Sequence, residues 1–335
     1  MGYKNYNSEK KLIISTGDES GVGPEIILKA LYSKEIPKNI DITLVGSKIN
    51  LEKTYKNLKS LGLNNIADPR NYHVYDMTIP FSKDEKKKSH GNASFNYLKK
   101  AVEIAQENTK SGLVTAPICK KSWALAGHNY SGQTEFLAES CKSKNFGMLF
   151  TAKSPFTGWR FNTLLATTHI PLCEVPKKLD SLLIHSKLDL LAEFCRRYEK
   201  NPFLKVAGLN PHAGEEGILG CEEINWINNS INYWRGKNKN IKISGPISPD
   251  SCWNSSATAW RDKNELGHNG ILAMYHDQGL IPMKAIALNY SVNTTLGLPF
   301  VRTSPDHGTG FDIAGKGIAQ CQSMIEAIKT AIDFT

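Results

Sequence analysis

The chain has 335 residues with an ordinary globular balance of 40% hydrophobic and 22% charged side chains. Its 41 Lys and Arg residues exceed its 32 Asp and Glu residues, and the resulting net charge of +9 suggests an anionic partner such as nucleic acid, acidic lipid or a small phosphate. No apolar run approaches the ~18 residues of a membrane helix and the seven cysteines form no Cys-x-x-Cys pair, so we expect neither a membrane protein nor a disulfide or zinc-finger scaffold.

Short apolar strands alternate with helical patterns along the chain, which is typical of α/β layering. The expected strands, in chain order, are residues 12–15, 42–45, 113–115, 164–168, 205–209 and 270–275. The expected helices are residues 24–32, 92–108 and 182–198. Polar segments rich in Gly and Pro follow several strands, and ligands bind beyond the carboxyl ends of the strands in open α/β sheets. We therefore expect the chemistry at these strand ends.

A glycine-rich segment, residues 16–25, joins the first strand to the first helix. Backbone amides in such a turn can face an anion at the N-terminus of a helix. The pair Gly21 and Gly23 lacks the third glycine of a dinucleotide fingerprint, however. A tight turn without a ligand explains the glycines equally well.

Two further segments are assigned no catalytic role. Residues 310–316 mimic a P-loop, but Gly317 stands where a P-loop has Ser or Thr, so we expect no P-loop there. The preceding residues 304–310 are expected to form a structured loop. The charge run at residues 83–88 is expected to be a solvated loop, because it lacks the interleaved aromatic residues of a nucleic-acid surface.

Three histidines, His169, His212 and His276, stand where predicted strands end. Neutral imidazoles are common metal ligands, and three of them can form an open catalytic site. They are far apart in sequence and form no local motif such as His-Glu-x-x-His, so spacing alone leaves a structural role open for each. Their position beside turn-forming residues favours function.

Candidate anion-binding residues lie in two segments. Lys284, Asn293 and Arg302 have side chains suited to a carboxylate or phosphate, although a surface charge is the ordinary alternative for a single Lys or Arg. Residues 130–139 indicate a polar loop that opens a helix, where Thr134 either caps the helix or binds an anion.

Taken in order, these segments resemble the 4-hydroxythreonine-4-phosphate dehydrogenase family of the vitamin B6 pathway. The resemblance rests on the opening loop and on residues 209–215, 275–279 and 293–310. It implies an α/β fold of two α/β/α domains with an interdomain cleft, like that of isocitrate and isopropylmalate dehydrogenases. The implied domains are discontinuous, with approximate bounds of 1–130 plus 300–335 for the first and 131–299 for the second.

The resemblance also implies the site. It implies a homodimer with the active site at the dimer interface, NAD or NADP bound without the Rossmann fingerprint, and a divalent ion (zinc, magnesium or cobalt) held by His169, His212 and His276. The implied substrate contacts are Gln133, Thr134, Lys284, Asn293 and Arg302. The residues themselves do not identify the proton acceptor, for which Asp250 is a candidate, or the residues that bind the cofactor.

The implied reaction is oxidation of 4-phosphohydroxy-L-threonine to 2-amino-3-oxo-4-(phosphooxy)butanoate, which loses carbon dioxide to give 3-amino-2-oxopropyl phosphate. A metal that chelates the substrate hydroxyl lowers its pKa, and the nicotinamide accepts the hydride. We expect a phosphorylated small molecule as the partner, with no nucleic acid and no membrane. We also expect a cytoplasmic protein, since residues 1–11 lack the apolar core of a signal peptide.

The chain departs from the family pattern at two places. Gln133 stands where the family usually has a histidine that contacts the substrate, and Glu19 and Ser20 replace the commoner Pro and Ala. Glutamine can still donate and accept hydrogen bonds, but it does not titrate near neutral pH. A sugar-acid phosphate such as D-threonate 4-phosphate is therefore an alternative substrate. A non-catalytic protein that binds anions or nucleic acid is the alternative from another class, and its affinity would fall steeply with salt.

Overall fold

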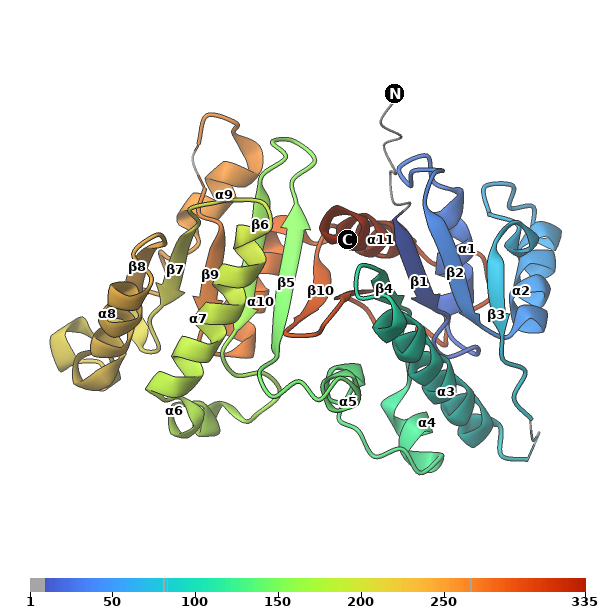
Figure 1. The fold of residues 1–335 in the computed structure, drawn as a ribbon, viewed down its shortest axis with the longest axis horizontal. Helices are drawn as coiled ribbons and strands as arrows, with labels where there is room; N and C mark the ends of the chain where they lie inside the picture. The colour runs from blue at the N-terminus through green and yellow to red at the C-terminus, as the bar shows by residue number, and fades with distance from the viewer. Residues whose placement is uncertain (1–9, 81, 83, 266) are drawn as a thin grey trace, which may run out of the picture. The chain divides into compact units, whose positions relative to one another are not determined.

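The computed structural model describes residues 10–80, 82, 84–265 and 267–335 (Figure 1). The chain divides into two compact units, one formed by Met1–Ser143 with Leu298–Thr335 and the other by Lys144–Gly297. The C-terminal segment thus returns to the first unit, where α11 (Gln322–Phe334) packs on β4 and β11. The first unit extends past residue 130 to Ser143, so Gln133 and Thr134 belong to it and not to the second unit.

The first unit contains five parallel strands in the order β3-β2-β1-β4-β11. These strands are β1 (Lys11–Ser15), β2 (Asp41–Gly46), β3 (His73–Asp76), β4 (Gly112–Thr115) and β11 (Val301–Pro305). The other helices of this unit are α1 (Gly23–Tyr32), α2 (Lys48–Ser60), η1 (Pro69–Asn71), α3 (Lys86–Glu107), α4 (Lys120–Leu125) and α5 (Gln133–Ser140).

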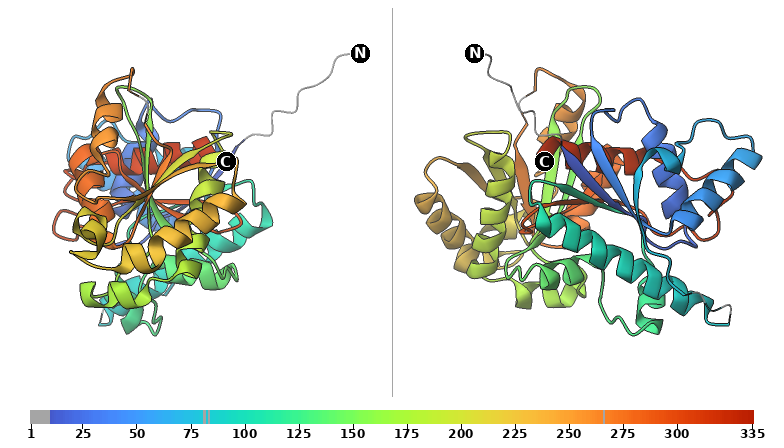
Figure 2. Two further views of the ribbon diagram at one scale, coloured as in Figure 1. Left: turned by 90° about the vertical axis from the view of Figure 1, so that its left-hand side faces the viewer. Right: turned by 45° about the vertical axis from the view of Figure 1, so that its right-hand side comes forward.

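Helices cover both faces of this sheet. Successive side chains of a strand point to opposite faces, so each strand contributes side chains to both cores. Ile13 of β1 lies in the core that α3 provides. Leu12, on the opposite face, lies beside Gly112, where Ala331 of α11 also packs. Figure 2 shows α3 and the dark red α11 on either side of these strands. Buried on both faces, β1 and β4 read as nearly unbroken apolar runs.

An aromatic cluster joins α3, α4 and α5. The ring centroid of Phe95 lies 4.8 Å from that of Phe136 and 5.3 Å from that of Trp123. Trp123 is fully buried, and its Nε1 donates to Ser94 Oγ at 2.9 Å. This packing fixes α5, which carries Gln133 and Thr134 in its first turn.

The second unit contains six strands in the order β10-β5-β6-β9-β7-β8. The four strands from β6 to β8 are parallel, whereas β5 runs antiparallel to both β6 and β10. The strands are β5 (Gly147–Lys153), β6 (Arg160–Leu165), β7 (Phe203–Ala207), β8 (Lys242–Ile247), β9 (Gly270–Ala273) and β10 (Val292–Leu296). The helices are η2 (Leu172–Glu174), α6 (Val175–Lys178), α7 (Ser181–Arg196), η3 (Pro211–Gly217), η4 (Glu223–Ile227), α8 (Asn228–Lys237), α9 (Asn254–Arg261) and α10 (His276–Ala287).

Helices also cover both faces of the second sheet. Ile271 of β9 lies in one core with Trp260 of α9 and Met283 of α10. Gly270, one residue earlier and therefore on the other face, is in contact with Leu191 of α7. Because β6, β9 and β7 are parallel neighbours, their carboxyl ends lie at the same edge of the sheet. Each of the three predicted metal ligands follows one of these ends.

All nine predicted elements are present, with differences at their ends. Helix α3 begins at Lys86, so part of the charge run predicted as a loop is helical; Lys83 lies outside the described residues. Strand β6 ends at Leu165, three residues before the predicted end. Five strands, β3, β5, β8, β10 and β11, were not predicted, and β8 contains the strand-breaking pair Gly245 and Pro246.

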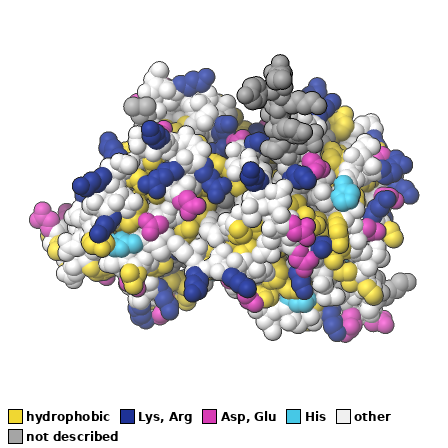
Figure 3. Space-filling model, viewed as in Figure 1, with side chains coloured by type: hydrophobic (Ala, Val, Ile, Leu, Met, Phe, Trp, Pro, Cys, Tyr) yellow, Lys and Arg dark blue, Asp and Glu magenta, His cyan; other side chains and the backbone are white. Residues whose placement is uncertain are grey.

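The net charge of +9 suggested an anionic partner. Lys and Arg side chains are spread across the face drawn in Figure 3, with Asp and Glu side chains among them. In the described part of the chain, no helix is both long and apolar enough to cross a bilayer.

Candidate functional site

The carboxyl edge of the first sheet carries a buried cation. Arg302 of β11 is 2% exposed, and its Nη2 donates to Thr115 Oγ1 at 2.7 Å and to Gln133 Oε1 at 3.2 Å. Gln133 Nε2 in turn donates to the backbone oxygen of Ala116 at 3.2 Å. Because Thr115 ends β4 and Gln133 begins α5, a strand and a helix together hold the guanidinium. The structure thus brings together two residues that were predicted to bind substrate.

Burial affects the acidity of this cation. It lowers the pKa of Arg302 to about 10, while the Glu135 carboxylate acts in the opposite direction. The side chain therefore stays protonated at neutral pH, and an anionic ligand would offset part of the cost of burying it. Thr134 is buried in the first turn of α5, but the N-cap of that helix is Gly132 and no side chain caps it. The capping alternative for Thr134 is wrong, and anion binding by its hydroxyl stays a prediction.

In the second unit, two of the three predicted metal ligands face one another. His169 follows β6 and His276 begins α10 after β9; their ring centroids are 5.4 Å apart. Thr167 Oγ1 donates to the backbone oxygen of Met274 at 2.8 Å and ties the two strand ends together. Two imidazoles on one tetrahedral ion, each with a metal–nitrogen distance of ~2.1 Å, have centroids about 5 Å apart, so this pair fits two ligand positions.

The orientation of His276 supports the same role. Its Nδ1 lies 2.7 Å from Asp277 Oδ1, which leaves Nε2 for a ligand. Carboxylates that hold one ring nitrogen in this way orient metal-binding histidines and raise their basicity. The donor set of the pair therefore suits a divalent ion.

His212 lies on a different loop, the turn η3 after β7, and its side chain is exposed. A hydrogen bond from Ser248 is the main cause that lowers the pKa of Asp250, and the nearby His212 contributes to the same shift. Among the described residues, no three His, Cys, Asp or Glu side chains lie close enough to hold one ion. Within one chain the histidines thus form a pair, with His212 near Asp250.

The remaining two predicted contacts also lie in the second unit. Lys284 is exposed on α10, the helix that His276 begins. Asn293 lies on β10, and within the described residues its buried Oδ1 accepts no hydrogen bond. Since a buried amide oxygen without a donor is costly, Asn293 has the capacity to accept one from a ligand. The predicted substrate contacts are therefore divided between the units, with Gln133, Thr134 and Arg302 in the first.

Gln278 has a role that the sequence patterns do not predict. Its Oε1 accepts the backbone N–H of Met274 at 2.6 Å, and its Nε2 donates to the backbone oxygen of Gly208 at 2.7 Å. One buried amide therefore links the strand end before His276 to the strand end before His212. The position of Gln278 two residues after His276 is the sequence signal for this role, but the sequence alone does not show which way its side chain points.

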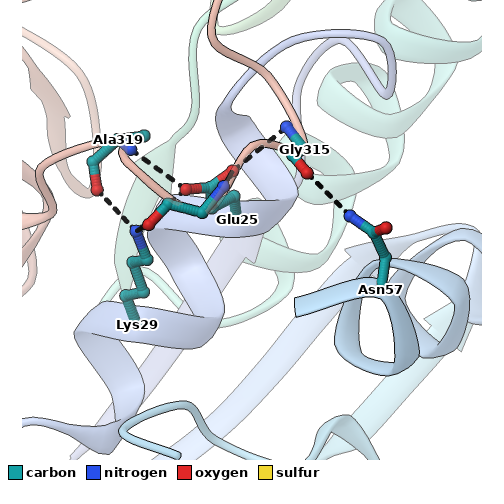
Figure 4. Close-up of polar contacts among 6 residues, drawn as sticks. Glu25, Lys29, Asn57, Gly315 and Ala319 are labelled. Atoms are coloured by element: carbon teal, nitrogen blue, oxygen red, sulfur yellow. Dashed lines mark hydrogen bonds and ion pairs between the residues drawn. The ribbon is translucent and has the colours of Figure 1, made fainter. Parts of the chain in front are cut away.

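The segment that mimics a P-loop binds a carboxylate of the chain itself. Glu25 of α1 is 1% exposed and accepts the backbone N–H groups of Gly315 and Ala319, each at 3.1 Å (Figure 4). Lys29 Nζ donates to Glu25 Oε1 and to the backbone oxygen of Ala319, both at 2.8 Å. Asn57 Nδ2 donates to the backbone oxygen of Gly315 at 2.7 Å. The Gly315 N–H of the P-loop-like segment thus donates to a carboxylate of the chain itself. Of residues 304–310, which were predicted to form a structured loop, Ser304 and Pro305 instead end strand β11.

Comparison with known proteins assigns the family. A family model described as "Pyridoxal phosphate biosynthetic protein PdxA" matches residues 38–331. The chain belongs to this family. A 4-hydroxythreonine-4-phosphate dehydrogenase of Synechococcus sp. (strain RCC307) is 47% identical over 328 residues, which cover 97% of this chain and 99% of that protein. The predicted resemblance to this PdxA family is confirmed.

Solved structures agree with the α/β fold of this PdxA family member. The crystal structure of 4-hydroxythreonine-4-phosphate dehydrogenase from Klebsiella pneumoniae matches with a TM-score of 0.80 and 30% identity, covering 98% of each chain. An isocitrate dehydrogenase from Methylococcus capsulatus matches with a TM-score of 0.51 and 14% identity, over 97% of this chain and 85% of that one, which is a likeness of fold alone. The predicted fold class is confirmed.

Proposed function

We propose that the chain is an NAD- or NADP-dependent 4-hydroxythreonine-4-phosphate dehydrogenase. It would oxidise 4-phosphohydroxy-L-threonine to 2-amino-3-oxo-4-(phosphooxy)butanoate, which decarboxylates to 3-amino-2-oxopropyl phosphate. The observation that carries this proposal is the 47% identity to the Synechococcus enzyme over nearly the whole of both chains.

A divalent ion is part of the proposal, with His169, His212 and His276 as its ligands and zinc, magnesium and cobalt as the candidates. The paired rings of His169 and His276 and the Asp277 carboxylate on His276 Nδ1 support it. Because His212 lies on a separate, exposed loop, we propose that a homodimer with the site at its interface completes the ligand set.

Each group has a distinct task in the proposed reaction. A bound ion supplies Lewis acidity that lowers the pKa of the substrate hydroxyl, and a bound nicotinamide supplies the hydride acceptor. Arg302, as a buried cation with a fixed fork of donors, binds the phosphate and positions the substrate. Gln133, Thr134, Lys284 and Asn293 add hydrogen bonds and a second cation. Asp250 is the proposed proton acceptor, and its lowered pKa makes it a weaker base than an ordinary carboxylate.

The test is a paired assay of the purified full chain. With a divalent ion and either NAD or NADP, the protein is offered 4-phosphohydroxy-L-threonine and D-threonate 4-phosphate in separate reactions, and the reduced nicotinamide is measured. The two compounds differ in that the sugar acid has a hydroxyl in place of the amine. We expect kcat/KM for the amino acid to exceed that for the sugar acid by about 100-fold or more, because a site that hydrogen-bonds the amine discriminates against a compound with the hydroxyl. A preference for D-threonate 4-phosphate, or oxidation of neither compound, would contradict the proposed substrate.

A further inference from the structure

The loop that carries His212 has an unusual backbone. Six consecutive residues, 212–217, have positive φ angles between 40° and 96°, and only Gly214 and Gly217 among them are glycines. In the described part of the chain, the only other non-glycine residue with a positive φ angle is Lys142. The left-handed conformation is unfavourable at every non-glycine residue, so other contacts must hold this turn in place.

The turn is built against one buried carboxylate, that of Glu223 in η4. Glu223 is 1% exposed, and its Oε1 accepts the backbone N–H groups of Leu209 at 2.7 Å and Asn210 at 2.8 Å. Its Oε2 accepts Asn210 Nδ2 at 2.8 Å. A β-carbon at Gly208 would lie 3.3 Å from Oε1, and one at Gly214 would lie 3.1 Å from Oε2. The backbone from residue 208 to residue 214 therefore curves closely around this carboxylate.

Glu223 itself is held by well-packed structure. It begins η4, which continues directly into α8, and Ile227 and Ile231 of these helices are fully buried. Trp234 of α8 donates from Nε1 to Asp189 Oδ1 of α7 at 2.8 Å. Packed helices thus hold the Glu223 carboxylate in place, and its hydrogen bonds restrain the loop whose histidine is exposed.

We propose that Glu223 is a positioning residue for His212: its carboxylate holds residues 209–210 at the start of the left-handed turn and so sets the direction of the imidazole. This inference rests on the proposed function, in which His212 is a metal ligand. Partners that orient metal ligands in this way typically contribute 10–100-fold to metal affinity.

The adjacent Glu222 provides a matched control. Its Oε2 accepts Asn210 Nδ2 at 2.7 Å, but no contact of its carboxylate with the backbone amides of Leu209 or Asn210 is found. Glu222→Gln therefore removes the same charge one residue away and leaves the backbone contacts in place. In Glu223→Gln, a neutral amide oxygen replaces the carboxylate oxygen that accepts two backbone N–H groups, and it is a weaker acceptor. The amide N–H₂ group of the glutamine also faces donors instead of accepting from them.

The experiment compares the full-length wild-type protein with the Glu223→Gln and Glu222→Gln variants. Amide hydrogen exchange of residues 207–217 reports on the turn, and titration with Co²⁺ alone, followed by its visible absorption, reports on ligand geometry. For Glu223→Gln we expect at least about 10-fold faster exchange at Leu209 and Asn210, about 10-fold weaker Co²⁺ binding and an altered spectrum. Glu222→Gln should stay within about 2-fold of wild type in both measurements.

The outcomes separate this inference from the proposed function. Wild-type exchange and Co²⁺ affinity in Glu223→Gln would overturn the inference, and equal effects of the two variants would also overturn it. A wild-type protein that binds no Co²⁺ would instead contradict the proposed metal, and the exchange data would still decide the role of Glu223 in the turn. If Glu223→Gln fails to fold, Glu223→Asp, which keeps the charge but shortens the reach, must show the same two changes to a smaller extent; wild-type behaviour would overturn the inference.

Discussion

The anion-binding group of the first unit and the histidine group of the second are built in different ways. Arg302 is buried on strand β11, and its hydrogen bonds to Thr115 and Gln133 are already made within one chain. In the second unit only His169 and His276 face one another, while His212 lies on an exposed, left-handed loop. Strand β4 and helix α5 thus preorganise the proposed phosphate anchor, whereas His169 and His212 lie on loops that other residues must hold.

The two units also share a structural feature, a buried carboxylate that accepts hydrogen bonds from backbone N–H groups of a loop. Glu25 does this for the loop after β11 and is paired with Lys29; Glu223 does it for the loop after β7. The Glu25 loop holds none of the predicted site residues, whereas the Glu223 loop carries His212. Loss of the first carboxylate should therefore affect stability, and loss of the second should affect metal binding.

The largest effect is expected from Glu25→Gln. The change leaves Lys29 without its buried counter-charge, so we expect the free energy of unfolding to fall by about 3–5 kcal/mol, measured by urea denaturation. Co²⁺ affinity of the folded protein should not change, because the variant lies in the other unit. Glu103→Gln, which removes an exposed ion pair with Lys100, should cost less than about 1 kcal/mol. A loss for Glu25→Gln as small as that of this control would contradict a stabilising role for the loop contact.

A smaller effect, on catalysis rather than stability, is expected from Arg302→Met. We expect kcat/KM for the phosphorylated substrate to fall about 100-fold, or about 2.7 kcal/mol, because the bidentate anchor is lost. The melting temperature should stay the same or rise, since an apolar side chain of similar size is cheaper to bury than a cation. Arg196→Met, an exposed change on α7, is the control. A lower melting temperature with an unchanged kcat/KM would make Arg302 a structural residue.

The parts of the fold that follow from local pattern were predictable. Apolar runs such as residues 113–115 and the turn residues after them locate the strands and place the histidines at strand ends. The edge strand β8 was missed because Gly245 and Pro246 interrupt its pattern. The start of α3 was missed because consecutive lysines, including Lys86–Lys88, are typical of solvated loops and have no apolar periodicity.

The residue types of the site were predictable, but the residues that hold them in place were not. His169 and His276 stand beside turn-forming residues, whereas the roles of Gln278 and Glu223 depend on hydrogen bonds to backbone groups of other strand ends. The local sequence marks only His212 and Gly214 of residues 212–216 as suited to the left-handed region, since Ala and Glu have no preference for it. That conformation arises from tertiary contacts.

One measurement tests the central claim most directly. Chelator-treated wild-type, His276→Ala and His73→Ala proteins are assayed for oxidation of 4-phosphohydroxy-L-threonine before and after Zn²⁺ is added; His73 is an exposed histidine on β3 and serves as the control. We predict that all three are inactive without metal and that the wild type and His73→Ala regain activity with Zn²⁺, while His276→Ala does not. Full activity of the metal-free wild type, or full recovery of His276→Ala, would contradict the account.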